Sequence, residues 1–167
     1  MIIPVYRVTT SQFPIAATTT VYPGQVVKIT STSGKITLCG STETPIGLAG
    51  DRNVASEALE WVNRVSDSGN DTAASGMMTV YHSGGEFYTD QYAVSVASLT
   101  GANLGAPLYA VEGVLSTATT DSSIIVARLL AAPGQIMSGV PGVDVSGDIA
   151  LGSEQTNNNY IAIKLAI

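Results

Sequence analysis

The feature that most limits the possible folds is a pattern of short β-type runs, separated by glycines, that occurs twice in the chain. The first copy covers residues 24–49 and the second covers residues 105–128. In each copy a turn glycine, Gly34 or Gly113, lies the same number of residues before an isoleucine of the third run. Two copies of one strand–turn–strand–loop–strand unit would explain this spacing. A chance match between two glycine-punctuated β segments is the alternative, because strands and turns draw on few residue types.

Two further segments have the pattern of β-strands. In residues 161–167, isoleucine or leucine alternates with small or charged residues, which is the period of a half-buried strand. Residues 77–99 are predicted to form strands around a turn at 83–85. The chain of 167 residues is long enough for one domain with its own core. We therefore predict a single all-β domain over residues 1–167, a small β-barrel or sandwich with one short helix.

Residues 51–76 interrupt the repeated β pattern. Ala58, Val62 and Val65 recur at three- and four-residue steps, so we predict an inserted segment that forms a short amphipathic helix and a loop. The segment also contains the only tryptophan, Trp61. Its side chain either packs the helix onto the β domain or anchors another subunit, because buried aromatic side chains dominate the energetics of interfaces.

The N-terminal residues 1–8 have the composition of an arm that binds a neighbour. They include Ile2, Ile3 and Tyr6, which makes the segment too apolar for a solvated tail. Pro4 has no N–H to donate to a strand ladder and therefore suits the edge of a sheet. We predict that this arm leaves the domain and adds an edge strand to a neighbouring subunit, with these apolar side chains and Trp61 as partner-binding residues.

The composition excludes several classes of partner. The formal net charge is -6, and the seven lysines and arginines occur singly along the chain, so no basic stripe is available for nucleic acid or an anionic membrane. No apolar run approaches the roughly 20 residues that cross a bilayer, and the N-terminus has no features of a signal peptide. We expect a protein made in a cytoplasm. Only 12% of its residues are charged, which suits a surface covered by neighbouring subunits.

The sequence contains no recognisable catalytic or cofactor motif. Adjacent Ser83 and His82 would point to opposite faces of a strand, and no G-x-S-x-G elbow is present, so a serine triad is not predicted. The glycines of residues 105–113 precede a proline and a β-type run instead of a helix, which argues against a phosphate-binding loop. We predict that the protein is not an enzyme and binds no cofactor.

No metal site or disulfide is predicted either. The acidic pairs Asp67 with Asp71 and Asp144 with Asp148 lack the ligand count of a calcium loop, so their expected role is the capping of turns. Cys39 is the only cysteine, so no internal disulfide can form. Its expected role is that of a small buried apolar residue.

The segments "YPGQVVKIT", "GKITLCGSTETPIGLAG", "LGAPLYAVEGVLS" and "IIVARLL" resemble the capsid decoration, or cement, proteins of tailed bacteriophages. The resemblance covers roughly residues 22–50 and 99–132. It implies a barrel-like β subunit that binds the outside of an assembled head, often as a homotrimer. The implied partners are the major capsid protein and two further copies of this chain, and the implied location is the exterior of the virion. Residues 51–76 have no counterpart in this resemblance.

Two other functions fit the same sequence features. A tail-tube or spike subunit would have a similar β-rich structure and a similarly low charge. A small hydrolase could assemble its site from carboxylates that are distant in sequence, because separation along the chain does not exclude proximity in space. Finding the protein on heads would favour a decoration protein, and finding it on tails would favour a tail-tube or spike subunit. A concave site with paired carboxylates would favour the hydrolase.

Overall fold

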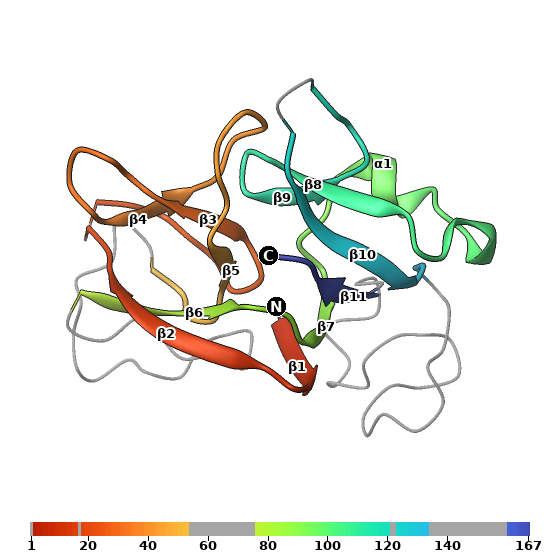
Figure 1. The fold of residues 1–167 in the computed structure, drawn as a ribbon, viewed down its shortest axis with the longest axis horizontal. Coiled ribbons are helices and arrows are strands. Elements are labelled where there is room, and N and C mark those ends of the chain that lie inside the picture. Colours follow the sequence, from red (N-terminus) through yellow and green to blue (C-terminus); the bar gives the residue numbers. More distant parts are fainter. Residues whose placement is uncertain (1, 17, 54–75, 121–122, 134–159) are drawn as a thin grey trace, which may run out of the picture.

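A computed structural model describes residues 2–16, 18–53, 76–120, 123–133 and 160–167, which form two antiparallel sheets packed together (Figure 1). One sheet has six strands in the order β1-β7-β11-β10-β8-β9, and the other has five in the order β2-β6-β5-β3-β4. The strands of the first sheet are β1 (Ile2–Tyr6), β7 (Glu86–Thr89), β8 (Pro107–Val111), β9 (Val114–Ser116), β10 (Ile125–Ala131) and β11 (Ile161–Leu165). Those of the second are β2 (Thr9–Pro14), β3 (Val26–Ile29), β4 (Ile36–Leu38), β5 (Gly47–Ala49) and β6 (Met77–His82).

The predicted all-β class is confirmed, and the sandwich rather than the barrel is the correct architecture. Strands β1 and β9 form the edges of one sheet and β2 and β4 those of the other, and no ladder among the described strands joins these edges. One isolated parallel bridge accompanies each sheet, between Ile15 and Ile36 in one and between Tyr92 and Leu115 in the other. Each bridge brings the two sides of a curled sheet together at a single point without closing it.

The predicted duplication is confirmed and covers more strands than the sequence pattern indicated. The two repeats have the same strand order. Adding five to each strand number in β2-β6-β5-β3-β4 gives β7-β11-β10-β8-β9, which is the order of the last five strands in the other sheet. We call β2–β6 the first repeat and β7–β11 the second repeat. The turn glycines Gly34 and Gly113 occupy equivalent positions and have φ angles of 65° and 82°. The described strands therefore form two copies of one five-stranded unit, with β1 added to the edge of the second.

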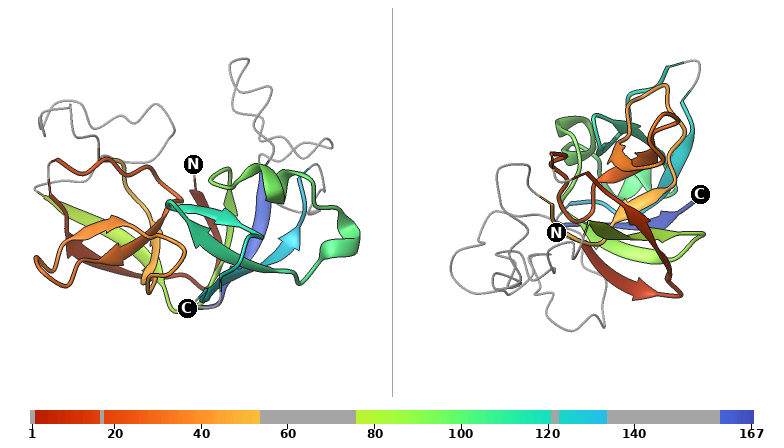
Figure 2. Two further views of the ribbon diagram at one scale, coloured as in Figure 1. Left: turned by 90° about the horizontal axis from the view of Figure 1, so that it is seen from above. Right: turned by 90° about the vertical axis from the view of Figure 1, so that its left-hand side faces the viewer.

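A two-stranded ribbon connects the repeats. Strands β1 and β2 run antiparallel to β7 and β6, from Ile2 opposite Thr89 to Pro14 opposite Met77, with a register shift between Pro4 and Tyr6. The ribbon bends between the two sheets, where Arg7, with φ of 49°, lies opposite Ser83 and two glycines that also have positive φ. These left-handed conformations let both strands turn at the same point. Figures 1 and 2 show both chain termini at the junction of the two repeats.

The main hydrophobic core belongs to both repeats. It contains Val26, Cys39 and Leu48 of the first repeat together with Phe87, Leu108 and other side chains of the second. A smaller core lies within the first repeat, built from Ile15, Val21, Val27, Ile36, Ala49, Met78 and Val80. Because the larger core is shared, we expect the two repeats to unfold together.

The turn between β8 and β9 also links the repeats. The N–H of Gly113 donates to the carbonyl of Cys39 at 2.9 Å, and the carbonyl of Gly113 accepts from the N–H of Val26 at 2.7 Å. A Cβ at this glycine would lie 2.7 Å from Cδ2 of Leu38, whereas a Cβ at Gly34 would meet nothing within 4 Å. Gly113 thus contacts the first repeat, whereas the space around the equivalent Gly34 is open.

Gly113→Ala is therefore expected to destabilise the protein more than Gly34→Ala, although both glycines have positive φ. The left-handed conformation costs an alanine roughly 1–2 kcal/mol at either position. Only Gly113→Ala adds the collision with Leu38, which we expect to cost about another 1–3 kcal/mol. Urea unfolding of both variants measures the difference, and equal losses would contradict the tight contact at Gly113.

The expected strand after residue 90 is partly wrong. Residues Val94–Ala97 form the short helix α1, and Gly101–Asn103 form a 3₁₀ turn. A strand would place Val94 and Val96 on one face, but Val94 is 87% exposed while Val96 is buried. Val96 and Leu99 both contact the shared core, so the apolar spacing here is that of a helical turn. The helix predicted within residues 51–76 lies outside the described residues, apart from the flanking positions 51–53 and 76.

The N-terminal segment forms part of its own chain's sheet, whereas we expected an arm that leaves the domain. Residues Ile2–Tyr6 form β1 at the edge of the six-stranded sheet, paired with β7. The physical reason is burial, because Ile2 is only 2% exposed and contacts the shared core. Pro4 occupies an edge strand, as expected, and the outer side of β1 has no partner among the described strands.

Candidate functional site

The residues predicted to bind a partner do not share one surface. Ile2 faces the shared core, and Ile3 packs on the opposite side of β1 against a cluster that contains Tyr88 and Tyr160. Tyr6 is the most exposed of the three, at 53%. The alternation of a strand separates them, since Ile2 and Ile3 point to opposite faces. Trp61 lies outside the described residues, so its predicted contact remains a prediction.

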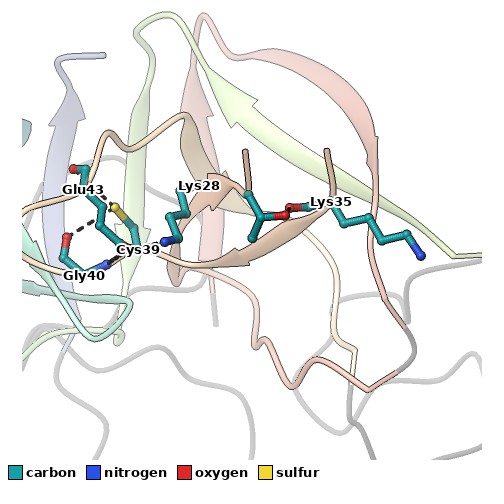
Figure 3. Close-up of polar contacts among 6 residues, drawn as sticks. Lys28, Lys35, Cys39, Gly40 and Glu43 are labelled. Atoms are coloured by element: carbon teal, nitrogen blue, oxygen red, sulfur yellow. Dashed lines mark hydrogen bonds and ion pairs between the residues drawn. The ribbon is translucent and has the colours of Figure 1, made fainter. Parts of the chain in front are cut away.

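Figure 3 shows a polar corner after β4 that has a structural role. The ammonium of Lys28 bonds to the Glu43 carboxylate, whose other oxygen accepts from the Gly40 N–H at 2.6 Å. These bonds hold the pKa of Glu43 below its usual value, the Lys28 hydrogen bond contributing most. Cys39 is fully buried, and burial, followed by the charge of Glu43, raises its pKa to about 11. The thiol therefore stays protonated near neutral pH, which fits the predicted packing role better than nucleophilic chemistry.

His82 is partly buried and its ring has two hydrogen-bond partners. It is the last residue of β6, and its Nε2 and Nδ1 lie 2.8 Å from Ser11 Oγ and 2.7 Å from Ser83 Oγ. Ser83 can reach the ring because its φ of 60° takes it out of the strand, which overturns the opposite-face argument. Among the described residues, the ring nitrogens therefore lie within hydrogen-bond distance of two neutral hydroxyls. A serine triad needs an acidic group on one ring nitrogen, and neither partner supplies it.

Three cations that are far apart in sequence meet at one end of the six-stranded sheet. Lys164 of β11 is the cross-strand partner of Glu86 in β7 and of Arg128 in β10. On the other side of β7, Glu86 is paired with Tyr6 of β1. Directly opposed residues of an antiparallel sheet lie on the same face, and Lys164 shares its face with Ala162 rather than with the shared core. We call this set of side chains, together with Arg7, the basic row.

A small hollow of about 120 Å³ lies beside the basic row, lined by Tyr6, Arg7, Gly85, Glu86 and Lys164. Its volume is well below the roughly 300–1,000 Å³ of ordinary ligand pockets. It can therefore admit one side chain of a partner but not a cofactor. The guanidinium of Arg7 lies 4.9 Å from the centroid of the Tyr6 ring, within the range of a cation–π contact.

The basic row was missed by sequence reasoning, which found the cations scattered singly. Arg7, Arg128 and Lys164 are each exposed. They are three of the seven lysines and arginines in the chain. Only the strand register brings them together, and a single sequence carries no direct signal of that register. The one local indication was Lys164, because the alternation in residues 161–167 places this charge on the exposed side of the strand.

The described residues offer no site for a metal ion. Within them no group of three or more histidine, cysteine or acidic side chains is close enough to hold a cation. The acidic pairs in residues 67–71 and 144–148 lie outside the described ranges, so their predicted capping role remains a prediction. Among the described helices, none has the length and apolar character needed to cross a membrane.

Comparison with known proteins gives no assignment. Neither a protein-family model, nor a curated protein, nor a solved structure matches this chain.

Proposed function

We propose that this chain is a structural virion protein that binds the outer surface of a phage head and bridges subunits of the major capsid protein. It acts as a homotrimer without enzymatic activity or a cofactor, and it contacts neither nucleic acid nor a membrane. It is made in the host cytoplasm and remains on the exterior of the virion. The sequence resemblance to decoration proteins provides the functional class, and the fold provides the physical rationale.

The observation that carries the proposal is the internal duplication. Two five-stranded repeats with one strand order are joined by a continuous ribbon and by a shared core. The shared core makes the repeats one rigid body that presents two related surfaces in a constant orientation. A shell is built from identical subunits, so a body with two related surfaces is suited to contact two neighbouring subunits at once. Contact with both raises the effective affinity without any new kind of interaction.

The chemistry of the described side chains also suits a static contact. The edge strand β2 presents Thr9, Thr10, Ser11 and Gln12, which are uncharged and mostly exposed. Its ladder with β6 is regular over all six residues. An uncharged, regular edge is available for pairing with another chain. The one cysteine is buried and stays protonated, and the one histidine is held by two hydroxyls.

The proposal is tested by locating the protein on particles and by measuring shell stability. We expect gold-labelled antibodies against the chain to mark heads, and heads that lack the protein to break at a lower temperature. Adding the purified protein should restore the heat resistance, because binding only the assembled shell stabilises it by about 2.7 kcal/mol per site at a hundredfold excess over Kd. Sedimentation should give three times the chain mass of 17.1 kDa.

An unrelated acidic protein at the same concentration serves as the control for the heat measurement. Labelling confined to tails would replace the proposal with a tail-tube or spike subunit. A protein that neither labels particles nor changes the temperature at which heads break would contradict a virion role altogether.

A further inference from the structure

We infer that the basic row binds a carboxylate-rich segment of the protein surface that this chain decorates. The inference rests on the proposed function, because it names the face of the chain that meets the shell. The row crosses four strands in one line, from Tyr6 and Arg7 through Glu86 and Lys164 to Arg128. It lies on the face of the six-stranded sheet that does not contribute to the shared core.

The charge distribution favours an acidic partner. The row contains three cations and one carboxylate, Glu86, and therefore has a formal charge of about +2 on a chain whose net charge is -6. The remainder of the chain is therefore more acidic than the whole. A local positive region on an acidic molecule orients its approach to an acidic surface while the rest of the molecule is repelled.

Two of the three cations are held in place before any partner binds. Arg7 has a φ of 49° and lies over the Tyr6 ring, and Arg128 donates from Nη1 to the Gly105 carbonyl at 3.0 Å. A residue other than glycine in a left-handed conformation is strained, and such strain clusters at binding sites. A planar guanidinium that is already oriented loses less entropy when it binds a carboxylate, and it can form two parallel hydrogen bonds.

The hollow beside the row limits the size of the ligand to a single side chain. Its charged lining is Arg7, Lys164 and the single carboxylate Glu86, so two cations outnumber one anion, and Tyr6 also lines it. An aspartate or glutamate of the partner could enter it and bind both cations, while Arg128 binds a second carboxylate further along the row. Nucleic acid is disfavoured, because three cations are fewer than the about six to ten phosphate contacts of a typical DNA-binding protein.

The test uses a synthetic peptide of alternating glutamate and glycine as the acidic probe. Titration into the isotope-labelled protein should shift amide resonances of β1, β7 and β11, and raising the salt concentration should weaken the binding. Lys164→Glu should raise the Kd of the peptide at least about tenfold, since it replaces an attraction with a repulsion. A peptide with lysine in place of glutamate should cause no shifts in these strands.

Lys35→Glu is the matched control. Lys35 is also an exposed lysine, it lies beside the turn of the first repeat, and its substitution changes the net charge by the same amount. We expect its effect on the peptide Kd to stay within about twofold. Equal weakening by both variants would show that only net charge matters and would overturn the inference. Should Lys164→Glu fail to fold, the milder Arg128→Gln must still weaken the peptide at least about threefold.

Binding to heads separates this inference from the proposed function. If the native protein labels heads and Lys164→Glu labels them equally well, the function stands and the inference is wrong. If the native protein labels no particle, the function is wrong, while the peptide titration still decides whether the row binds carboxylates. Loss of self-association in Lys164→Glu, with unchanged binding to heads, would assign the row to contacts between copies and overturn the inference. Tighter binding of an oligonucleotide than of the acidic peptide would overturn it as well.

Discussion

Gly47→Ala is expected to destabilise the protein by about 3 kcal/mol or more, or to prevent folding. Gly47 is buried in β5, between β3 and β6. A Cβ at this position would lie 2.1 Å from the backbone carbonyl oxygen of Tyr81 and 2.6 Å from Cγ1 of Val80. The first neighbour is backbone within a ladder, so it cannot rotate away as a side chain could. The strand would have to move, which would break the pairing of β5 with β6.

Gly40→Ala is the matched control for this substitution. Gly40 also has ordinary backbone geometry, and the nearest atom to an added Cβ is a carboxylate oxygen of Glu43 at 3.1 Å, at the end of a side chain. We expect a loss of about 1 kcal/mol or less there, because the carboxylate can shift. Thermal unfolding should then show Gly47→Ala at least roughly 6–12 °C below the native protein. A Gly47→Ala variant that unfolds at the same temperature as Gly40→Ala would contradict the close approach of β5 and β6.

Phe87→Ala is expected to cost about 3–5 kcal/mol and to weaken both repeats at once. Phe87 is 1% exposed and belongs to the shared core. Its ring lies 5.1 Å from that of Tyr81 at an angle of 54°, and the two residues lie on either side of the bend in the ribbon. Removing the ring would therefore leave a cavity where the two sheets meet.

Calorimetry measures the loss of stability and shows whether both repeats share it. We expect one unfolding transition for the native protein and one, at a lower temperature, for Phe87→Ala, because the core is shared. Phe13→Ala is the control, since Phe13 is half-buried on the edge strand β2 beside the smaller core. It should lose less than half as much stability. Two separate transitions in the native protein would show that the repeats fold independently and would contradict the shared core.

Local patterns predicted much of the fold. The alternation in residues 161–167 predicted β11, whose Ile161, Ile163 and Leu165 enter the shared core. The matched spacing after Gly34 and Gly113 predicted the duplication. These predictions succeeded because a strand buries every second side chain and a turn with positive φ favours glycine, and both effects act over a few residues. The prediction failed at Val94–Ala97, where apolar spacing that fits both a strand and a helical turn was resolved by packing on the core.

The candidate site was beyond the reach of local patterns. Arg7 and Arg128 are 121 positions apart in the sequence, and Arg128 and Lys164 are 36 positions apart. Each reads as an isolated surface charge. The hydroxyl contacts of His82 were missed for a related reason, since Ser11 comes from another strand and Ser83 reaches the ring only through its positive φ.

The sequence by itself determined the all-β class, the two strand–turn–strand units, the burial of Cys39 and the overall acidity of the chain. Each of these depends on residue type and on short-range spacing. Only the tertiary structure decided that the domain is a sandwich, that β1 returns to its own sheet, and that three cations align across four strands. Strand pairing joins residues that are distant in sequence, and its register is selected by the burial of all the strands together. The face that we propose to meet the shell is therefore a property of the folded chain.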